Sequence, residues 1–133
     1  MKVDFTIPGK PYAKKRPRFS RKNGRAFDPK ENGTFENTVS SVALPHFSKP
    51  IDGPVRLNIR VTFSVPASLS KKKAAERLHR PHTQKPDADN LAKAIADGLN
   101  RIAWADDSQV YELAVRKVWG LTDMTYVTVE AME

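Results

Sequence analysis

The chain has 133 residues, no cysteine and a formal net charge of +8. This length predicts one domain with its own core, and the absence of cysteine excludes disulfides, thiolate zinc sites and cysteine nucleophiles. The three histidines lack zinc-ligand spacing and no apolar run reaches the length of a membrane span, so we expect a cytoplasmic protein that does not enter a membrane.

The excess charge lies at the N-terminal end. Residues 1–30 contain ten basic and two acidic side chains and carry all of the +8, while the rest of the chain sums to zero. A local excess of this kind is typical of a surface that binds a polyanion. Tyr12, Phe19 and Phe27 are interleaved with the charges, which favours a structured loop or hairpin over the alternative of a solvated, disordered arm.

The first elements follow from hydrophobic periodicity. Alternation over residues 3–7 predicts a short strand. Residues 10–30 are expected to form a basic loop or a hairpin that turns at Asn23-Gly24. Apolar residues at helical spacing then predict a helix over about 31–44.

The clearest strand covers residues 55–65, where odd positions are apolar and even positions are polar. A period of two gives one buried face and one wet face, so we expect an antiparallel or mixed sheet with helices on one side. Ser70 is expected to cap a short basic helix over 71–78.

A longer helix over about 90–101 carries an apolar stripe, and two further strands are expected at about 109–119 and 125–132. The predicted fold class is therefore α/β of the α+β kind, a single domain over residues 1–133 with a mixed sheet packed against helices.

The residues with the clearest chemistry flank this longer helix. Asp87 and Asp89 stand before it, with Asp89 expected at the N-cap, and Asp106-Asp107 follow it. Side chains two residues apart in extended chain point to the same side, and converging carboxylates suit Mg²⁺. Because the helix could bring its two ends to one sheet edge, we expect the two acidic pairs to meet. The alternative is that these residues are ordinary caps and turn residues.

Lys93 lies four residues after Asp89 and four before Asp97, so the three side chains share an exposed helix face. For Asp97, an ion pair with Lys93 is the favoured interpretation.

Residues 85–109 resemble the RusA family of Holliday junction resolvases. The resemblance rests on Lys-Pro-Asp-x-Asp-Asn-Leu-x-Lys, Asp-x-Leu-Asn and Trp-x-Asp-Asp-Ser-Gln, and it extends more weakly to the basic runs at 14–18 and 70–73. It implies a small homodimeric endonuclease that depends on Mg²⁺, with Mn²⁺ as a substitute, and is often encoded by phages or prophages. The implied substrate is branched DNA, above all the four-way junctions of recombination and repair.

The resemblance also implies site residues. The metal ligands would be Asp87, Asp89 and Asp107, with Asp106 as an alternative ligand, and the essential lysine would be Lys93. The residues predicted to bind DNA are Lys14, Lys15, Arg16, Arg18, Lys71, Lys72, Lys73 and Lys85.

Two other functions stay open. One is a nucleic-acid-binding protein without catalysis, whose aspartates are only caps and surface charges. The other is a metal-dependent nuclease that acts on RNA or another nucleic acid.

Overall fold

The structure is a computed structural model that describes residues 1–132. Its main strands are β1 (Lys2–Pro8), β4 (Val55–Ser64), β5 (Val110–Gly120) and β6 (Met124–Ala131). Its helices are α1 (Lys30–Ala43), α2 (Lys71–Arg77) and α3 (Ala88–Leu99), with single 3₁₀ turns η1 (Leu44–His46) and η2 (Asp107–Gln109). Two short strands, β2 (Arg18–Phe19) and β3 (Ala26–Phe27), form a separate hairpin.

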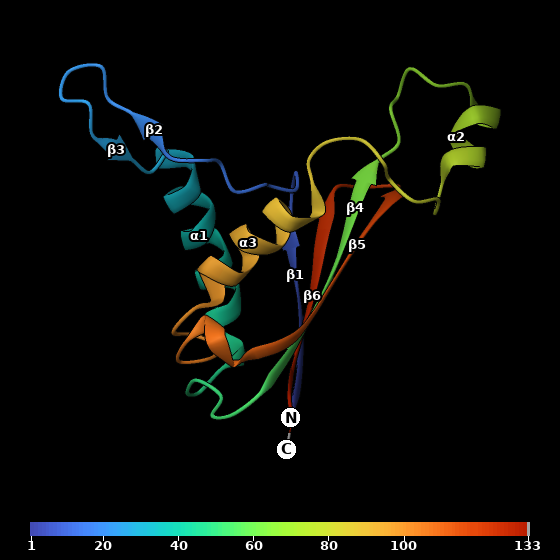
Figure 1. Cartoon of the computed structure of the whole chain (residues 1–133). Helices are drawn as coiled ribbons and strands as arrows, with labels where there is room; N and C mark the ends of the chain where they lie inside the picture. Colours follow the sequence, from blue (N-terminus) through green and yellow to red (C-terminus); the bar gives the residue numbers. More distant parts are fainter. Residues whose placement is uncertain (133) are drawn as a thin grey trace.

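The sheet has the order β1-β6-β4-β5, and α1 and α3 lie together on one of its faces (Figure 1). The β4–β5 pair is parallel, whereas β1–β6 and β4–β6 are antiparallel. The expected mixed sheet with helices on one side is therefore confirmed.

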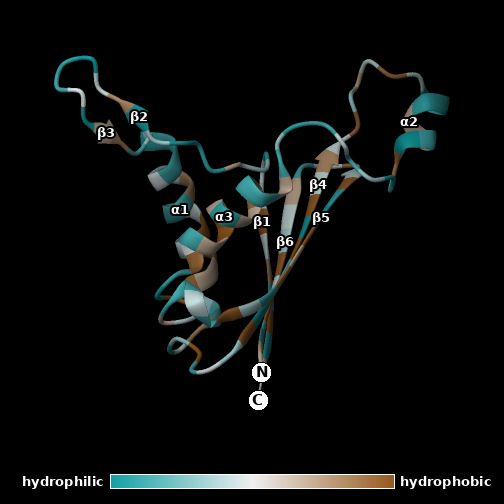
Figure 2. Ribbon diagram, viewed as in Figure 1, coloured by the Kyte–Doolittle hydropathy of each residue, from teal (hydrophilic) through white to brown (hydrophobic). Residues whose placement is uncertain are grey.

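The alternation along β4 explains the one-sided core. Val55, Leu57 and Ile59 are fully buried under the helices, while Asn58 and Arg60 on the other face are exposed to solvent. The apolar stripe of α3 completes the core, with its most buried members being Leu91, Ala94, Ile95 and Leu99. Hydrophobic residues accordingly line the space between helices and sheet (Figure 2).

A glycine sets the distance between the two helices. A Cβ atom at Gly98 of α3 would lie 2.6 Å from the Cβ of Val39 on α1, closer than side chains approach. The Ser40 hydroxyl donates to the Gly98 carbonyl at 2.8 Å, across the same contact. This close crossing fixes where the first turn of α3 lies relative to α1.

The start of α3 differs from the prediction. The helix begins at Ala88 with Asp87 as its N-cap residue, so the expected start at Asn90 with Asp89 as the cap is wrong. The reason is that the Asp87 carbonyl already accepts the Leu91 N–H at 3.2 Å and closes the first turn there. Asp89 therefore lies within the first turn.

β5 is an edge strand that is only partly covered. The segment 79–82 pairs with its C-terminal part, through His79 N–H to Trp119 O (2.9 Å) and His82 N–H to Lys117 O (2.9 Å). Nearer its start, Tyr111 and Leu113 are 55% and 51% exposed.

Within residues 1–132, no helix combines the length and the hydropathy needed to cross a membrane.

Candidate active site and nucleic-acid interface

The first acidic pair lies at the exposed N-terminus of α3. The Asp87 side chain makes no capping hydrogen bond, and both Asp87 and Asp89 are exposed. The partial positive charge of a helix N-terminus favours carboxylates at these positions. Two neighbouring carboxylates are thus left with oxygens that an external cation can bind.

The second acidic pair lies in η2, where a buried tryptophan organises it. Trp104 is fully buried and forms bridges with Asn100, just after α3, and with Ile51. Its indole N–H donates to Asp107 Oδ1 at 2.7 Å, which orients that carboxylate and leaves its second oxygen free for another ligand.

Asp106 has a different local role. Its carboxylate accepts hydrogen bonds from the hydroxyl and the backbone N–H of Ser108, which together hold the pKa of Asp106 below its usual value. The Gln109 side chain reciprocates by accepting the Asp106 backbone N–H at 3.0 Å, which completes a capping box. Asp106 therefore stabilises the turn that presents Asp107.

The two acidic pairs do not meet within one chain. The 12 residues of α3 span about 18 Å at 1.5 Å per residue, with Asp87 and Asp89 at its start and Asp107 beyond its end. In residues 1–132 no three His, Cys, Asp or Glu side chains come close enough to hold a metal ion. The expectation that one helix brings both pairs to a common sheet edge is wrong for a single chain, because α3 starts at the end of the molecule where α2 lies and ends toward the opposite end (Figure 1). The assignment of these aspartates as ligands stays a prediction.

A basic cleft lies next to the first acidic pair. The backbone N–H of Lys14 donates to the Asn90 carbonyl at 2.9 Å, which docks the segment before the hairpin onto the first turn of α3. The resulting cleft has a volume of about 370 Å³. Its lining residues are Lys14, Lys15, Arg16, Pro17, Asp28, Asn90 and Lys93. The structure thus brings Lys93 together with the N-terminal cations, as a site for an anion requires.

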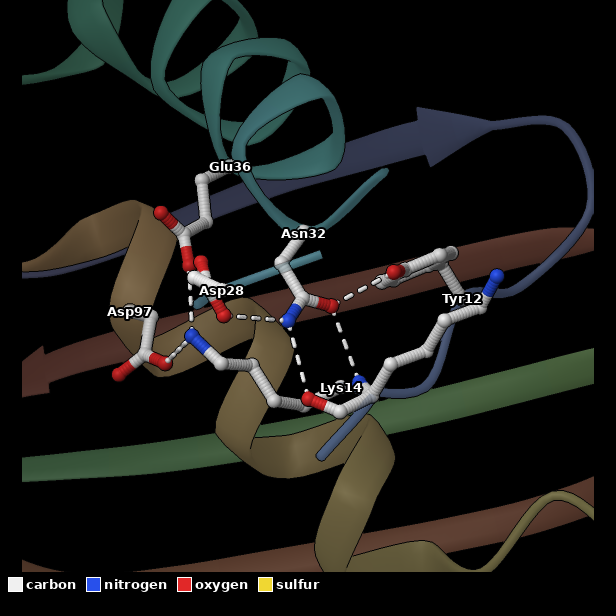
Figure 3. A network of polar contacts seen from close by, with 7 residues as sticks. Tyr12, Lys14, Asp28, Asn32, Glu36 and Asp97 are labelled. Atoms are coloured by element: carbon white, nitrogen blue, oxygen red, sulfur yellow. Dashed lines mark hydrogen bonds and ion pairs between the residues drawn. The ribbon is translucent and has the colours of Figure 1, made fainter. Parts of the chain in front are cut away.

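Lys14 differs from its neighbours because its ammonium is already paired. It lies 2.7 Å from Asp97 Oδ2 and 2.9 Å from Glu36 Oε1, and its side chain is only 19% exposed (Figure 3). Burial by itself would lower the pKa of Lys14, but the hydrogen bonds to Asp97 and Glu36 outweigh it and raise that pKa. The expected pair between Asp97 and Lys93 is therefore wrong, since Asp97 pairs with Lys14.

Sequence reasoning missed Asn32, which is 1% exposed and holds both ends of the hairpin (Figure 3). Its side chain accepts from Lys15 N–H (2.9 Å) and donates to Lys15 O (3.0 Å) and Asp28 Oδ1 (2.8 Å). The Tyr12 hydroxyl also donates to it, at 2.6 Å. No pattern marks this residue in the sequence, because an asparagine in a first helical turn usually faces water.

The remaining predicted DNA-binding residues, including Arg18 in β2, lie on exposed segments at the end of the molecule where α3 starts. Lys71, Lys72 and Lys73 open α2, which Ser70 caps as predicted through a 3.2 Å bond from Lys73 N–H. Lys85 is exposed in the loop that leads to Asp87. The β2–β3 hairpin and α2 extend on opposite sides of the molecule, both at the end where α3 starts (Figure 1).

His82 anchors the loop that carries Lys85 and Asp87. Its ring is stacked on Phe63 at 3.8 Å and contacts Trp119 at 4.5 Å between centroids. Burial, with a smaller effect of the Lys117 charge, lowers the pKa of His82 below its usual value. The residue is only 6% exposed, so it acts by packing rather than by touching a phosphate.

The chain is similar to known proteins over most of its length. The family model described as Endodeoxyribonuclease RusA matches residues 8–130. The chain is also similar to the uncharacterized protein YqaN of Bacillus subtilis (strain 168), with 40% identity over 125 residues, covering 88% of this chain and 87% of that protein. The family match includes the basic residues 10–30, α3 and η2.

Proposed function

This chain belongs to the RusA family of endodeoxyribonucleases, and on that premise we propose that it cuts branched DNA, above all four-way junctions, as a Mg²⁺-dependent homodimer. The observation that carries the proposal is the exposed Asp87–Asp89 pair beside the cleft that Lys93 shares with Lys15 and Arg16. Carboxylates that can hold a hard cation adjoin cations that can hold a phosphate.

The carboxylates present fit a Mg²⁺ site in their chemistry. Asp87 and Asp89 offer exposed oxygens, and Asp107 has one oxygen fixed by Trp104 and a second one to offer. Mg²⁺ takes oxygen ligands from a few carboxylates and keeps several waters. When bound, it would lower the pKa of a water and offset charge on the scissile phosphate.

The separation of Asp107 from Asp87 supports a site shared between two chains. β5 begins next to Asp107, and its C-terminal part is bordered by the segment that leads to Asp87. If the free part of β5 pairs antiparallel with the same strand of a second copy, the start of β5, next to Asp107, lies beside the C-terminal part of the partner's strand. That part is the one bordered by the segment that leads to Asp87. Tyr111 and Leu113 are large exposed side chains on this edge strand, and an edge of this kind favours pairing with another chain.

A twofold dimer of this kind also suits the substrate. Resolving a junction requires two cuts in strands related by near-twofold symmetry, and a closed dimer presents two equal sites. In each site Lys93 would place its ammonium on the phosphate, where a developing negative charge is stabilised. Lys15 and Arg16 would hold the flanking backbone by contacts that carry little sequence information.

A mixing experiment tests both the activity and the shared site. Asp87→Asn and Asp107→Asn should each lose cleavage of a synthetic four-way junction in Mg²⁺ while still binding it, because the basic surface is intact. In an equal mixture that exchanges subunits, half of the dimers are mixed and each holds one intact shared site, so about a quarter of wild-type nicking should return. Asp106→Asn should remain active.

A mixture of Asp87→Asn with Asp89→Asn is the matched control, since both changes affect the same end of α3 and no rescue is expected. Absence of rescue in the first mixture, with exchange verified, would place all ligands in one chain and refute the shared site. Junction binding without any cleavage by the wild type would favour a non-catalytic protein, and preferential cutting of RNA would favour a nuclease for another nucleic acid.

A further inference from the structure

The β2–β3 hairpin carries an aromatic side chain that the core does not use. Phe19 is 75% exposed, although the hairpin pairs only with itself and lies outside the main sheet. In Figure 2 the hairpin is hydrophilic except for short hydrophobic stretches at β2 and β3. An exposed ring on a projecting hairpin contributes little to stability, so a role in binding accounts for it better.

The hairpin has a firm base and a uniform charge. Asn32 of α1 is hydrogen-bonded to Lys15, before the hairpin, and to Asp28, after it, so both ends of the hairpin are fixed to α1. Residues 16–27 contain no acidic side chain. Their cations are Arg16, Arg18, Arg21, Lys22 and Arg25, all exposed.

The pairing register leaves one face of the Phe19 ring open. Phe19 lies opposite Ala26, and directly opposed residues share a face of a two-stranded ribbon. Alanine is too small to cover the ring. Phe27, by contrast, lies opposite Arg18 on the other face and is 46% exposed.

An open aromatic ring among cations is the arrangement that binds unstacked bases. The cations hold the phosphate backbone, and the ring stacks on any base whose face is accessible. Bases inside linear duplex are stacked on both faces, whereas at a branch point whose arms are held apart the last base pair of each arm lacks a neighbour on one face. The ring can therefore distinguish a branch point from duplex without reading sequence.

We propose that Phe19 stacks on a base exposed at the branch point and so makes the protein prefer branched over linear DNA. This inference rests on the proposed function, because it takes branched DNA as the substrate. Phe19 is assigned to substrate selection and has no part in hydrolysis.

The test compares Phe19→Ala with Phe27→Ala, the matched change on the other face of the hairpin. Phe19→Ala should weaken binding to a four-way junction by about 5- to 150-fold, the range expected for one lost base–aromatic stack, and leave duplex binding unchanged. With 2-aminopurine at the branch point, the fluorescence change caused by wild-type protein should disappear in Phe19→Ala. Phe27→Ala should behave as wild type in both assays.

Several results would overturn the inference. They are unchanged junction binding by Phe19→Ala, an equal loss on junction and duplex, or full binding by Phe19→Leu, which keeps apolar area without a ring. Dissociation of the dimer by Phe19→Ala would assign the ring to contact between copies instead. If wild-type protein cuts junctions but Phe19→Ala keeps the preference, only this inference fails; if wild-type protein binds no DNA, the proposed function fails with it.

Discussion

Replacing Lys14 by methionine tests whether this lysine anchors the basic residues 10–30 to the body of the protein or contacts DNA. Methionine keeps most of the aliphatic chain but removes the ammonium that lies between Asp97 and Glu36. The two carboxylates, which are 25% and 29% exposed, then face each other without a cation. The change therefore acts on folding and on how firmly the hairpin base sits against α1 and α3.

The size of the effect follows from burial. Removing one member of a fully buried ion pair costs about 3–5 kcal/mol. The side chains here keep 19–29% of their exposure, so solvent screens part of the repulsion, and we expect a loss of about 2–3 kcal/mol in the free energy of unfolding. Because the pKa of Lys14 is raised above its ordinary 10.5, this stabilisation is fully present at pH 7 and is lost only as the pH rises through the raised value.

The assay is urea unfolding at pH 7 together with DNA binding at several salt concentrations. Lys15→Met is the matched control, since Lys15 lies 4.0 Å from Glu31 and both side chains are about half exposed. It should change stability by less than about 0.5 kcal/mol but reduce the salt dependence of DNA binding by about one phosphate contact. A Lys14→Met variant as stable as Lys15→Met, with the larger loss of salt dependence, would refute the anchoring role and restore Lys14 as a DNA contact.

Two further predictions concern packing and pH. Gly98→Ala should lower the free energy of unfolding by about 1–3 kcal/mol, because its Cβ would meet Val39. Gly33→Ala has open space around it and should raise the free energy of unfolding by about 0.5–1 kcal/mol in the same urea assay. Equal effects of the two changes would contradict the close crossing of α1 and α3. Burial lowers the pKa of His82, so below pH 6.5 the imidazole is protonated more readily in the unfolded chain than in the folded one. The free energy of unfolding should therefore fall as the pH drops from 7.5 to 5.5. His82→Phe should reduce that fall in unfolding curves measured at both pH values, and an unchanged fall would show that another group causes it.

Local pattern determined most of the secondary structure. The alternation along β4, the apolar stripe of α3 and the Asn23-Gly24 turn each depend on neighbouring residues, and each predicted element exists in the structure. The same holds for the Ser70 cap. The start of α3 escaped prediction by two residues, because Asp87 and Asp89 are equally good N-cap types and the choice depends on which carbonyl closes the first turn.

The same distinction between local pattern and tertiary structure applies to the candidate site. Sequence alone marked the acidic pairs and the basic segment, because residue type and spacing carry their chemistry. Only the tertiary structure decided that Lys14 pairs with Asp97 and that a buried Asn32 holds the hairpin, since both contacts join segments far apart in the chain. It also decided that the chain after α3 does not bring Asp107 back to Asp87, because the path of the chain across a sheet is set by packing, which no local pattern contains.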